Sequence, residues 1–308
     1  MAQAFVNQHV VPQRYLLRFS ERKTHGKGGR IGVRIIDRNG EIRIFTTSIS
    51  DVAYSRNYYD DPQLTDPKHW EHLFSHEYEP LYGKPLERIY SRIILSTEGS
   101  RILNDDDKEL IGKLIAIQYL RIPDFLDRQQ LAGKKIGANF SKELHLKLGK
   151  RLSADKRNAI DRICNSSQNI RSIMMGVVTD AKRVEAYSKL IANDVMTVVY
   201  NATSIPFFTS DKPVILFNIT SQSMDYGDCG IARADTMIIY PISPQVLIQA
   251  YPRAWFNMDG QKCDGERILI TEREIGYVIS LNDLQINHAH QEVFFPPSFI
   301  TKVLYPTD

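Results

Sequence analysis

The first residues of the chain gather side chains that could take part in acid–base and phosphate chemistry. His9 comes shortly before Pro12, and Arg14, Tyr15 and Arg18 follow within a dozen positions. Proline favours an extended residue before it and a helix start after it, so His9 should lie just ahead of a helix N-terminus. The helix dipole there would keep the imidazole neutral, able to act as a base or a metal ligand. A histidine that only anchors the N-terminal segment fits the same pattern.

Further polar residues stand beside apolar stripes later in the chain. Gln118 and Arg121 are three apart on an expected helix, so both can face one side of it. Asp211 follows an expected strand and precedes Pro213, and loops at strand ends often carry functional side chains. An Asx-type turn that closes the strand is the alternative for Asp211.

Basic residues are concentrated in one segment. From Arg128 to Arg157, nine lysines and arginines face two acidic residues, whereas the whole chain carries a net charge of only +3. Such a segment, which includes Lys134 and Lys135, can follow phosphates, or it can be a solvated helix face with a mobile loop. The adjacent Tyr58 and Tyr59 could stack a base or cover the edge of a core.

The composition excludes several classes of protein. The 308 residues are 43% hydrophobic, enough for one large domain or two modest ones. No run approaches eighteen apolar residues, and no secretion signal is visible, so we expect a cytoplasmic protein without a membrane partner. Three widely spaced cysteines argue against a disulfide framework or a cysteine zinc site. Phosphate-binding loops, dinucleotide fingerprints and nucleophile elbows are absent from the sequence.

The N-terminal half contains clear secondary-structure signals. Alternating residues on both sides of Asn39-Gly40 predict a β-hairpin over 31–47. Helices are expected after Pro12, over 86–94 and from Asn104 to Pro123. Asn104 is a good N-cap, and the three aspartates after it suit the positive helix end better than a metal.

The middle of the chain is expected to be mainly helical. Gly133 and Gly137 bracket a segment that we expect to be flexible, and Ser153 should cap a helix that continues towards Met175. A further helix is expected over 181–194.

The last third changes to strand patterns. We expect strands over 195–200 and 207–217, and a hairpin of 236–240 with 246–251. Thr271 and Glu274 form a capping box, which should open a helix ending at Phe294-Phe295.

The expected fold is therefore α+β. An N-terminal arm and hairpin precede a largely helical middle, an antiparallel or mixed C-terminal sheet and a final helix. We expect one interlocked domain over 1–308, with a helical subdomain over 84–194 as its internal division.

Five motifs in a fixed order resemble a known family. The opening Asn7-Gln8-His9 with Val11-Pro12, Tyr15-Leu16 and Phe19 is similar to the start of the bacterial domain-of-unknown-function family 4238. The later motifs are Gln118 to Pro123, Thr209 to Val214, Pro241 to Pro244, and the helix with Asn282, Gln285 and Ala289. Arg14 departs from the pattern, which favours an apolar residue there. The resemblance implies that His9, Gln118, Arg121, Asp211 and Asn282 could share one pocket.

One hypothesis is a nucleic-acid-directed enzyme, a nuclease-like hydrolase or phosphoryl-transfer enzyme. It would be a ribonuclease-like effector, for example in bacterial anti-phage defence. His9 would be the acid or base, Asp211 would orient it, and Arg121 would stabilise phosphoryl charge. A divalent metal on Asp211 is a second mechanism, with its other ligands unknown. The expected substrate-binding residues are Gln118, Asn282, Arg14, Tyr58, Lys134 and Lys135.

The other hypothesis is a non-catalytic binding or sensor module with a protein partner. In that case His9, Asp211 and Asn282 are structural and tie the N-terminal segment to the C-terminal sheet. The sequence leaves both hypotheses open and gives no oligomeric state.

Overall fold

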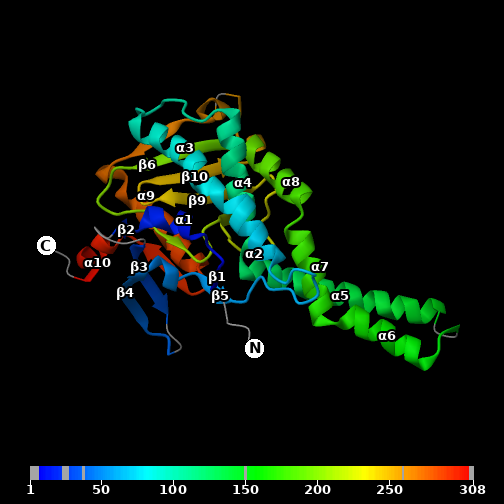
Figure 1. The fold of residues 1–308 in the computed structure, drawn as a ribbon. Coiled ribbons are helices and arrows are strands. Elements are labelled where there is room, and N and C mark those ends of the chain that lie inside the picture. Colours follow the sequence, from blue (N-terminus) through cyan, green and yellow to red (C-terminus); the bar gives the residue numbers. More distant parts are fainter. Residues whose placement is uncertain (1–6, 23–27, 37–38, 149–150, 259, 305–308) are drawn as a thin grey trace.

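A computed structural model describes residues 7–22, 28–36, 39–148, 151–258 and 260–304 and confirms the α+β class (Figure 1). The helices are α1 Gln13–Leu16, α2 His69–Leu73, α3 Lys84–Leu95, α4 Asp105–Arg121, α5 Pro123–Leu148, α6 Ala154–Asn165, α7 Ser167–Val178, α8 Ala181–Asn193, α9 Ile275–His288 and α10 Pro297–Leu304. The strands are β1 Asn7–His9, β2 Glu21–Arg22, β3 Gly29–Ile36, β4 Ile42–Ser48, β5 Tyr54–Arg56, β6 Val195–Asn201, β7 Thr209–Ser210, β8 Ile215–Asn218, β9 Thr236–Ser243, β10 Val246–Tyr251, β11 Arg267–Ile270 and β12 Glu292–Phe295.

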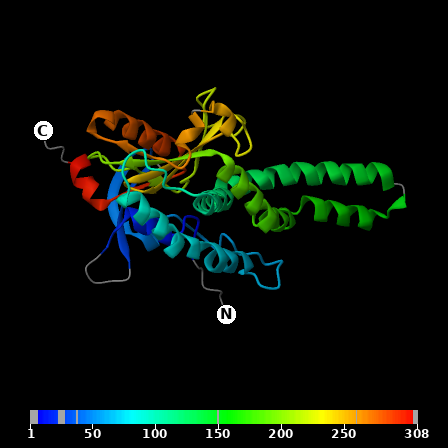
Figure 2. The same cartoon turned by 90° about the horizontal axis from the view of Figure 1, so that it is seen from above.

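The central sheet has the strand order β11-β6-β10-β9-β8 and is buried on both faces. All neighbours are antiparallel except β11 and β6, so the sheet is mixed. Alternate residues along β9 belong to different cores: Ile238 and Tyr240 join the cluster that contains α4, and Ile239 joins Val278 of α9. Figure 2 shows α9 and α4 on opposite sides of the sheet. The result is a three-layer arrangement.

A second sheet joins the two ends of the chain. Its strand order is β2-β3-β12-β7, and β4 pairs with β3 as the predicted hairpin. Phe294 of β12 lies opposite Val33 of β3 and Thr209 of β7. The Tyr15 hydroxyl bonds both the Thr209 hydroxyl, at 2.7 Å, and the Pro241 carbonyl, at 2.5 Å. The N-terminal arm therefore packs on the C-terminal strands, although a single domain over 1–308 stays a prediction.

The predicted caps are present. Asn104 and Asp107 form a reciprocal capping box at the start of α4, and the Ser153 hydroxyl accepts the Lys156 N–H at the start of α6. The Thr271–Glu274 box also forms, on a short 3₁₀ turn that leads into α9. Pro123 separates α4 from α5, as predicted, but it also begins the next helix.

The expectation of a flexible segment around Gly133 and Gly137 is wrong. Both lie inside the 26-residue helix α5, which projects from the body as a hairpin with α6 (Figures 1 and 2). A Cβ on Gly137 would lie 2.1 Å from the Cys164 carbonyl oxygen, so the glycine permits close helix packing rather than flexibility. No described helix, α5 included, is both long and apolar enough to cross a membrane.

Two other boundaries differ from the prediction. The expected strand 207–217 is interrupted at Asp211, so that β7 joins the second sheet and β8 the central one. Pro213, which lacks an N–H, lies in the break. Phe294 and Phe295 belong to β12, and α9 ends earlier, at His288, because the chain pairs with β3 there.

A substitution at Gly112 tests whether the stability of the fold depends on the close packing of α4 on α8. A Cβ there would lie 2.6 Å from the Ser188 carbonyl oxygen. We expect Gly112→Ala to lower the free energy of unfolding by about 1–3 kcal/mol, because the helices must separate. Gly276→Ala on α9 is the control, since nothing lies within 4 Å of its added Cβ. Urea unfolding would measure both, and equal effects would contradict the packing argument.

Candidate functional site

Segments from three of the five motif regions, and the connection that follows the helix of a fourth, meet at one cavity of about 350 Å³. Its wall includes Val10 from the N-terminal arm, Pro123 at the start of α5, Asp211 after β7, and the connection from α9 to β12. The side chains able to do chemistry there are Tyr54, Tyr58, Asp124, Asp127, Asp211, Lys212, His290 and Glu292. We call this space the motif cavity.

Asp211 binds backbone at the edge of the motif cavity. Its carboxylate accepts the N–H groups of His290, Gln291 and Glu292, at 2.8, 2.7 and 3.1 Å. Its own N–H donates to the Glu292 carbonyl at 3.0 Å. Burial raises the pKa of Asp211 even though the three N–H groups favour its charged form. The carboxylate therefore fixes the chain that carries His290 and Glu292.

Glu292 has the acid–base properties that a catalytic carboxyl needs. Its carboxylate accepts the Ala53 N–H at 2.7 Å. Burial raises the pKa of Glu292 to about 7, the nearby charge of Asp211 adds to the shift, and the Ala53 hydrogen bond opposes it. A carboxyl with such a pKa can accept or donate a proton at neutral pH.

Lys212 supplies positive charge on another wall, beside the ring of His290. Lys212 Nζ lies 2.8 Å from one oxygen of Asp124, and His290 Nδ1 lies 3.7 Å from the other. Burial alone would raise the pKa of Asp124, but the hydrogen bond and charge of Lys212 outweigh it, and the pKa is lowered. The exposed fraction of the His290 side chain is 60%, so its ring is open to solvent.

Arg121 and Gln118 hold the N-terminal arm. The buried Arg121 guanidinium donates to the His9 carbonyl at 2.5 Å and lies 4.6 Å from the centre of the Phe74 ring. Gln118 donates to the Val10 carbonyl at 3.1 Å. Both side chains thus bind backbone that leads to the motif cavity, without lining it.

His9 and Asn282 also lie outside the motif cavity. Burial lowers the pKa of His9, which favours the neutral ring, and burial rather than a helix end is the leading cause of the shift. The His9 ring lies beside the Gln13 amide, at 3.2 and 3.3 Å. Asn282 accepts the Phe208 N–H and donates to the Pro206 carbonyl. The structure therefore brings Asp211 to the cavity but does not bring His9 or Asn282 into it.

The remaining expected substrate-binding residues are spread over the molecule. Tyr58 lines the motif cavity, with the Arg171 guanidinium 5.0 Å from its ring centre. Lys134 and Lys135 are exposed on the projecting helix α5, and Arg14 is exposed beside a different cavity. The roles proposed for these residues stay predictions.

The sequence does not single out two titratable residues of the cavity, Glu292 and His290. Neither residue belongs to a recognisable motif. Both lie in a stretch for which the sequence predicts the end of a helix, whereas α9 ends before them, at His288. Asp124 could have been found, since it directly follows the Gln118–Pro123 motif. No group of three metal-ligating side chains that could hold an ion occurs among the described residues, so the metal mechanism also stays a prediction.

Asp211→Ala tests the backbone role of this carboxylate. The change leaves three N–H groups without their acceptor, so we expect the free energy of unfolding to fall by about 2–4 kcal/mol. Asp211→Asn keeps one acceptor oxygen and should lose less. Urea unfolding of both variants is the measurement. An alanine variant as stable as the wild type would show that the hydrogen bonds contribute nothing.

Glu292→Gln tests the raised pKa through stability. The folded-state pKa of about 7 exceeds the ordinary 4.5, so the neutral carboxyl stabilises the fold fully below pH 4.5. This contribution is lost as the pH rises through about 7, and the variant should lose less stability over that range. Asp194 also has a pKa of about 7, so the difference between variant and wild type, measured by urea unfolding from pH 4.5 to 8, isolates Glu292. Parallel pH profiles would contradict the assignment.

Comparison with known proteins gives one match. No curated protein and no solved structure matches the chain. A family model described as "Protein of unknown function (DUF4238)" matches residues 7–299. That range includes all five motifs and every wall of the motif cavity. The chain belongs to the DUF4238 family.

Proposed function

We propose that the protein is a nucleic-acid-directed enzyme, with the motif cavity as its reaction site and the α5–α6 hairpin as its docking surface. The placement of Glu292, with its pKa near neutrality, in a cavity bounded by the family motifs carries the proposal. RNA cleavage is the reaction that we favour. The biological role that we propose for this activity is that of an effector of anti-phage defence in the bacterial cytoplasm.

The proposed chemistry assigns the proton transfers to two residues of the cavity. The Glu292 carboxylate takes the proton from a ribose 2′-hydroxyl, whose oxygen attacks the adjacent phosphorus. The bond from phosphorus to the 5′-oxygen breaks, and His290 gives a proton to that leaving oxygen. Lys212 neutralises Asp124 nearby, which lessens the repulsion of the phosphate. Asp211 holds the chain that carries both reacting groups.

The hairpin supports binding of a phosphate backbone. α5 begins at the cavity with Pro123 and carries Lys134 to a point about 17 Å farther along its axis. Exposed basic residues continue along both helices, at Lys134, Lys135, Lys142, Lys147, Lys156 and Arg157. A projecting basic element can bind phosphates without base recognition.

A specific observation favours the second candidate, a non-catalytic binding or sensor module. Gln118, Arg121 and Asn282 all direct hydrogen bonds at backbone carbonyls, as expected if the motif residues were structural. The same contacts are compatible with an enzyme whose motifs shape the wall of its site. A cleavage assay therefore has to distinguish the enzyme from the non-catalytic module.

The assay incubates the purified protein with total RNA, tRNA, and single- and double-stranded DNA, with and without magnesium or manganese. We expect RNA cleavage, and about a 10²- to 10⁴-fold loss of rate in Glu292→Gln and in His290→Ala. Glu185→Gln, an exposed carboxyl on α8, is the matched control and should retain activity. Reversing the charges of Lys134 and Lys135 should weaken substrate binding more than it slows bound turnover.

Circular dichroism and unfolding curves confirm that each variant is folded. Full activity in folded Glu292→Gln would remove the proposed mechanism. Absence of cleavage by the wild type in every lane would favour the binding module.

A further inference from the structure

A second polar cavity lies at the other end of the β7–β12 strand pair. Pro206 precedes β7 and Pro296 follows β12, and both line this cavity of about 470 Å³. Asp211 and Glu292, at the opposite ends of the same strands, line the motif cavity. The two cavities are therefore distinct, and the second shares no lining residue with the proposed reaction site.

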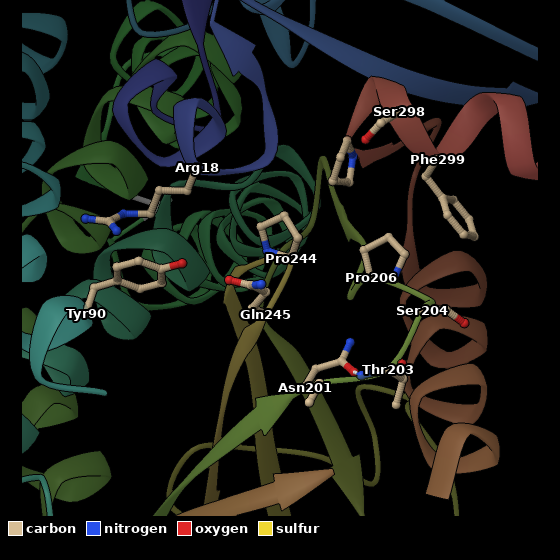
Figure 3. A pocket seen from close by; sticks show the side chains of 12 residues that line it. Arg18, Tyr90, Asn201, Thr203, Ser204, Pro206, Pro244, Gln245, Ser298 and Phe299 are labelled. Atoms are coloured by element: carbon tan, nitrogen blue, oxygen red, sulfur yellow. Dashed lines mark hydrogen bonds between the residues drawn. The ribbon is translucent and has the colours of Figure 1, made fainter. Parts of the chain in front are cut away.

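The second cavity combines a basic wall with hydrogen-bonding groups. Arg18 and Tyr90 form one side, and Gln245, Ser204 and Phe299 lie on others (Figure 3). The Tyr90 hydroxyl and the Gln245 side chain point towards one another (Figure 3). Asn201 is less available, because its amide already bonds the Ile205 carbonyl and the Thr203 N–H.

Arg18 is a cation of low exposure with incomplete pairing. The exposed fraction of its side chain is 10%, and its guanidinium lies 5.0 Å from the centre of the Tyr90 ring. Its charge is paired with Glu87 at 2.9 Å, but the exposed fraction of that side chain is 61%, so solvent weakens the pair. Arg18 Nε has no hydrogen-bond partner among the described residues. A ligand with negative charge would complete this environment.

Arg14 extends the positive charge by one helical turn. It lines an adjoining cavity of about 420 Å³, which shares Arg18 and Tyr90 with the first. A Cβ on Gly83 would lie 3.2 Å from Arg14 Nη1, so the glycine leaves room for the guanidinium. Arg14 is exposed and lines this cavity, and none of the ion pairs among the described residues includes it.

We propose that these adjoining cavities bind a mononucleotide. Two arginines one turn apart suit a phosphate, because a guanidinium donates paired hydrogen bonds to it. The larger cavity then takes the base and ribose, with the Phe299 ring as a flat apolar surface and the Gln245 amide and Ser204 hydroxyl as polar partners.

Calorimetric titration of the full chain tests this site. The probes are the four 5′-ribonucleoside monophosphates, inorganic phosphate and adenosine. At least one monophosphate should bind tighter than phosphate and adenosine do. Arg14→Ala should raise its Kd about tenfold or more, through the loss of a charge-assisted hydrogen bond. Arg14 is exposed, so this variant should fold even if a change of Arg18 does not.

Two controls separate this site from other basic surfaces. Arg43→Ala removes an exposed arginine of β4 that lines neither cavity, and it should leave the Kd unchanged. Charge reversal at Lys134 and Lys135 should also leave it unchanged, which distinguishes this site from the docking hairpin. Monophosphates that bind no tighter than phosphate, or an unchanged Kd in Arg14→Ala, would overturn the proposal. Failure of the cleavage assay alone would not affect it.

Discussion

The pairing of buried backbone groups is the constraint on which the rest of this structure depends. A buried N–H or carbonyl group without a hydrogen-bond partner lowers the stability of the fold. Irregular segments lack the regular backbone hydrogen bonds of helices and sheets that would pair these groups. Here side chains far away in the sequence supply the partners. Asp211 accepts three N–H groups after α9, while Gln118 and Arg121 bind the carbonyls of the N-terminal arm. These residues of the family motifs therefore connect distant segments through side-chain hydrogen bonds to backbone groups. The motif cavity lies where the connected segments meet.

The same arrangement gives the cavity its chemistry. A carboxyl placed close to another carboxylate and away from water is harder to ionise, and both factors act on Glu292. Asp211 keeps its place because three N–H groups compensate part of its burial. Burial raises the pKa of both acids, and three backbone N–H groups oppose the shift at Asp211 while one opposes it at Glu292.

Local signals in the sequence predicted much of the fold but little of the site. The Asn39-Gly40 hairpin, the Asn104 and Ser153 caps and the strands of 236–251 depend on short-range chemistry, and all of them form. The glycines of α5 were misread, because their reason is a neighbouring helix that no local pattern reveals. Glu292 could not be found from sequence either, since its raised pKa comes first from burial in the folded chain and then from the charge of Asp211, which lies far away along the chain.

The separation of charges explains how an acidic cavity could serve a phosphate-bearing substrate. Carboxylates repel phosphate, so the energy of binding has to come from elsewhere on the molecule. Helix α5 joins the two requirements, with Asp124 and Asp127 of its first turns in the cavity and its lysines exposed on the projecting part. Binding energy from contacts remote from the reacting atoms can hold a substrate in place although the carboxylates repel its phosphate. The same repulsion then favours release of the product. In the proposed enzyme the rigidity of α5 matters as much as its charge, because a flexible linker would let a nucleic-acid backbone move away from Glu292. The close packing of Gly133 and Gly137 against the neighbouring helices supplies that rigidity.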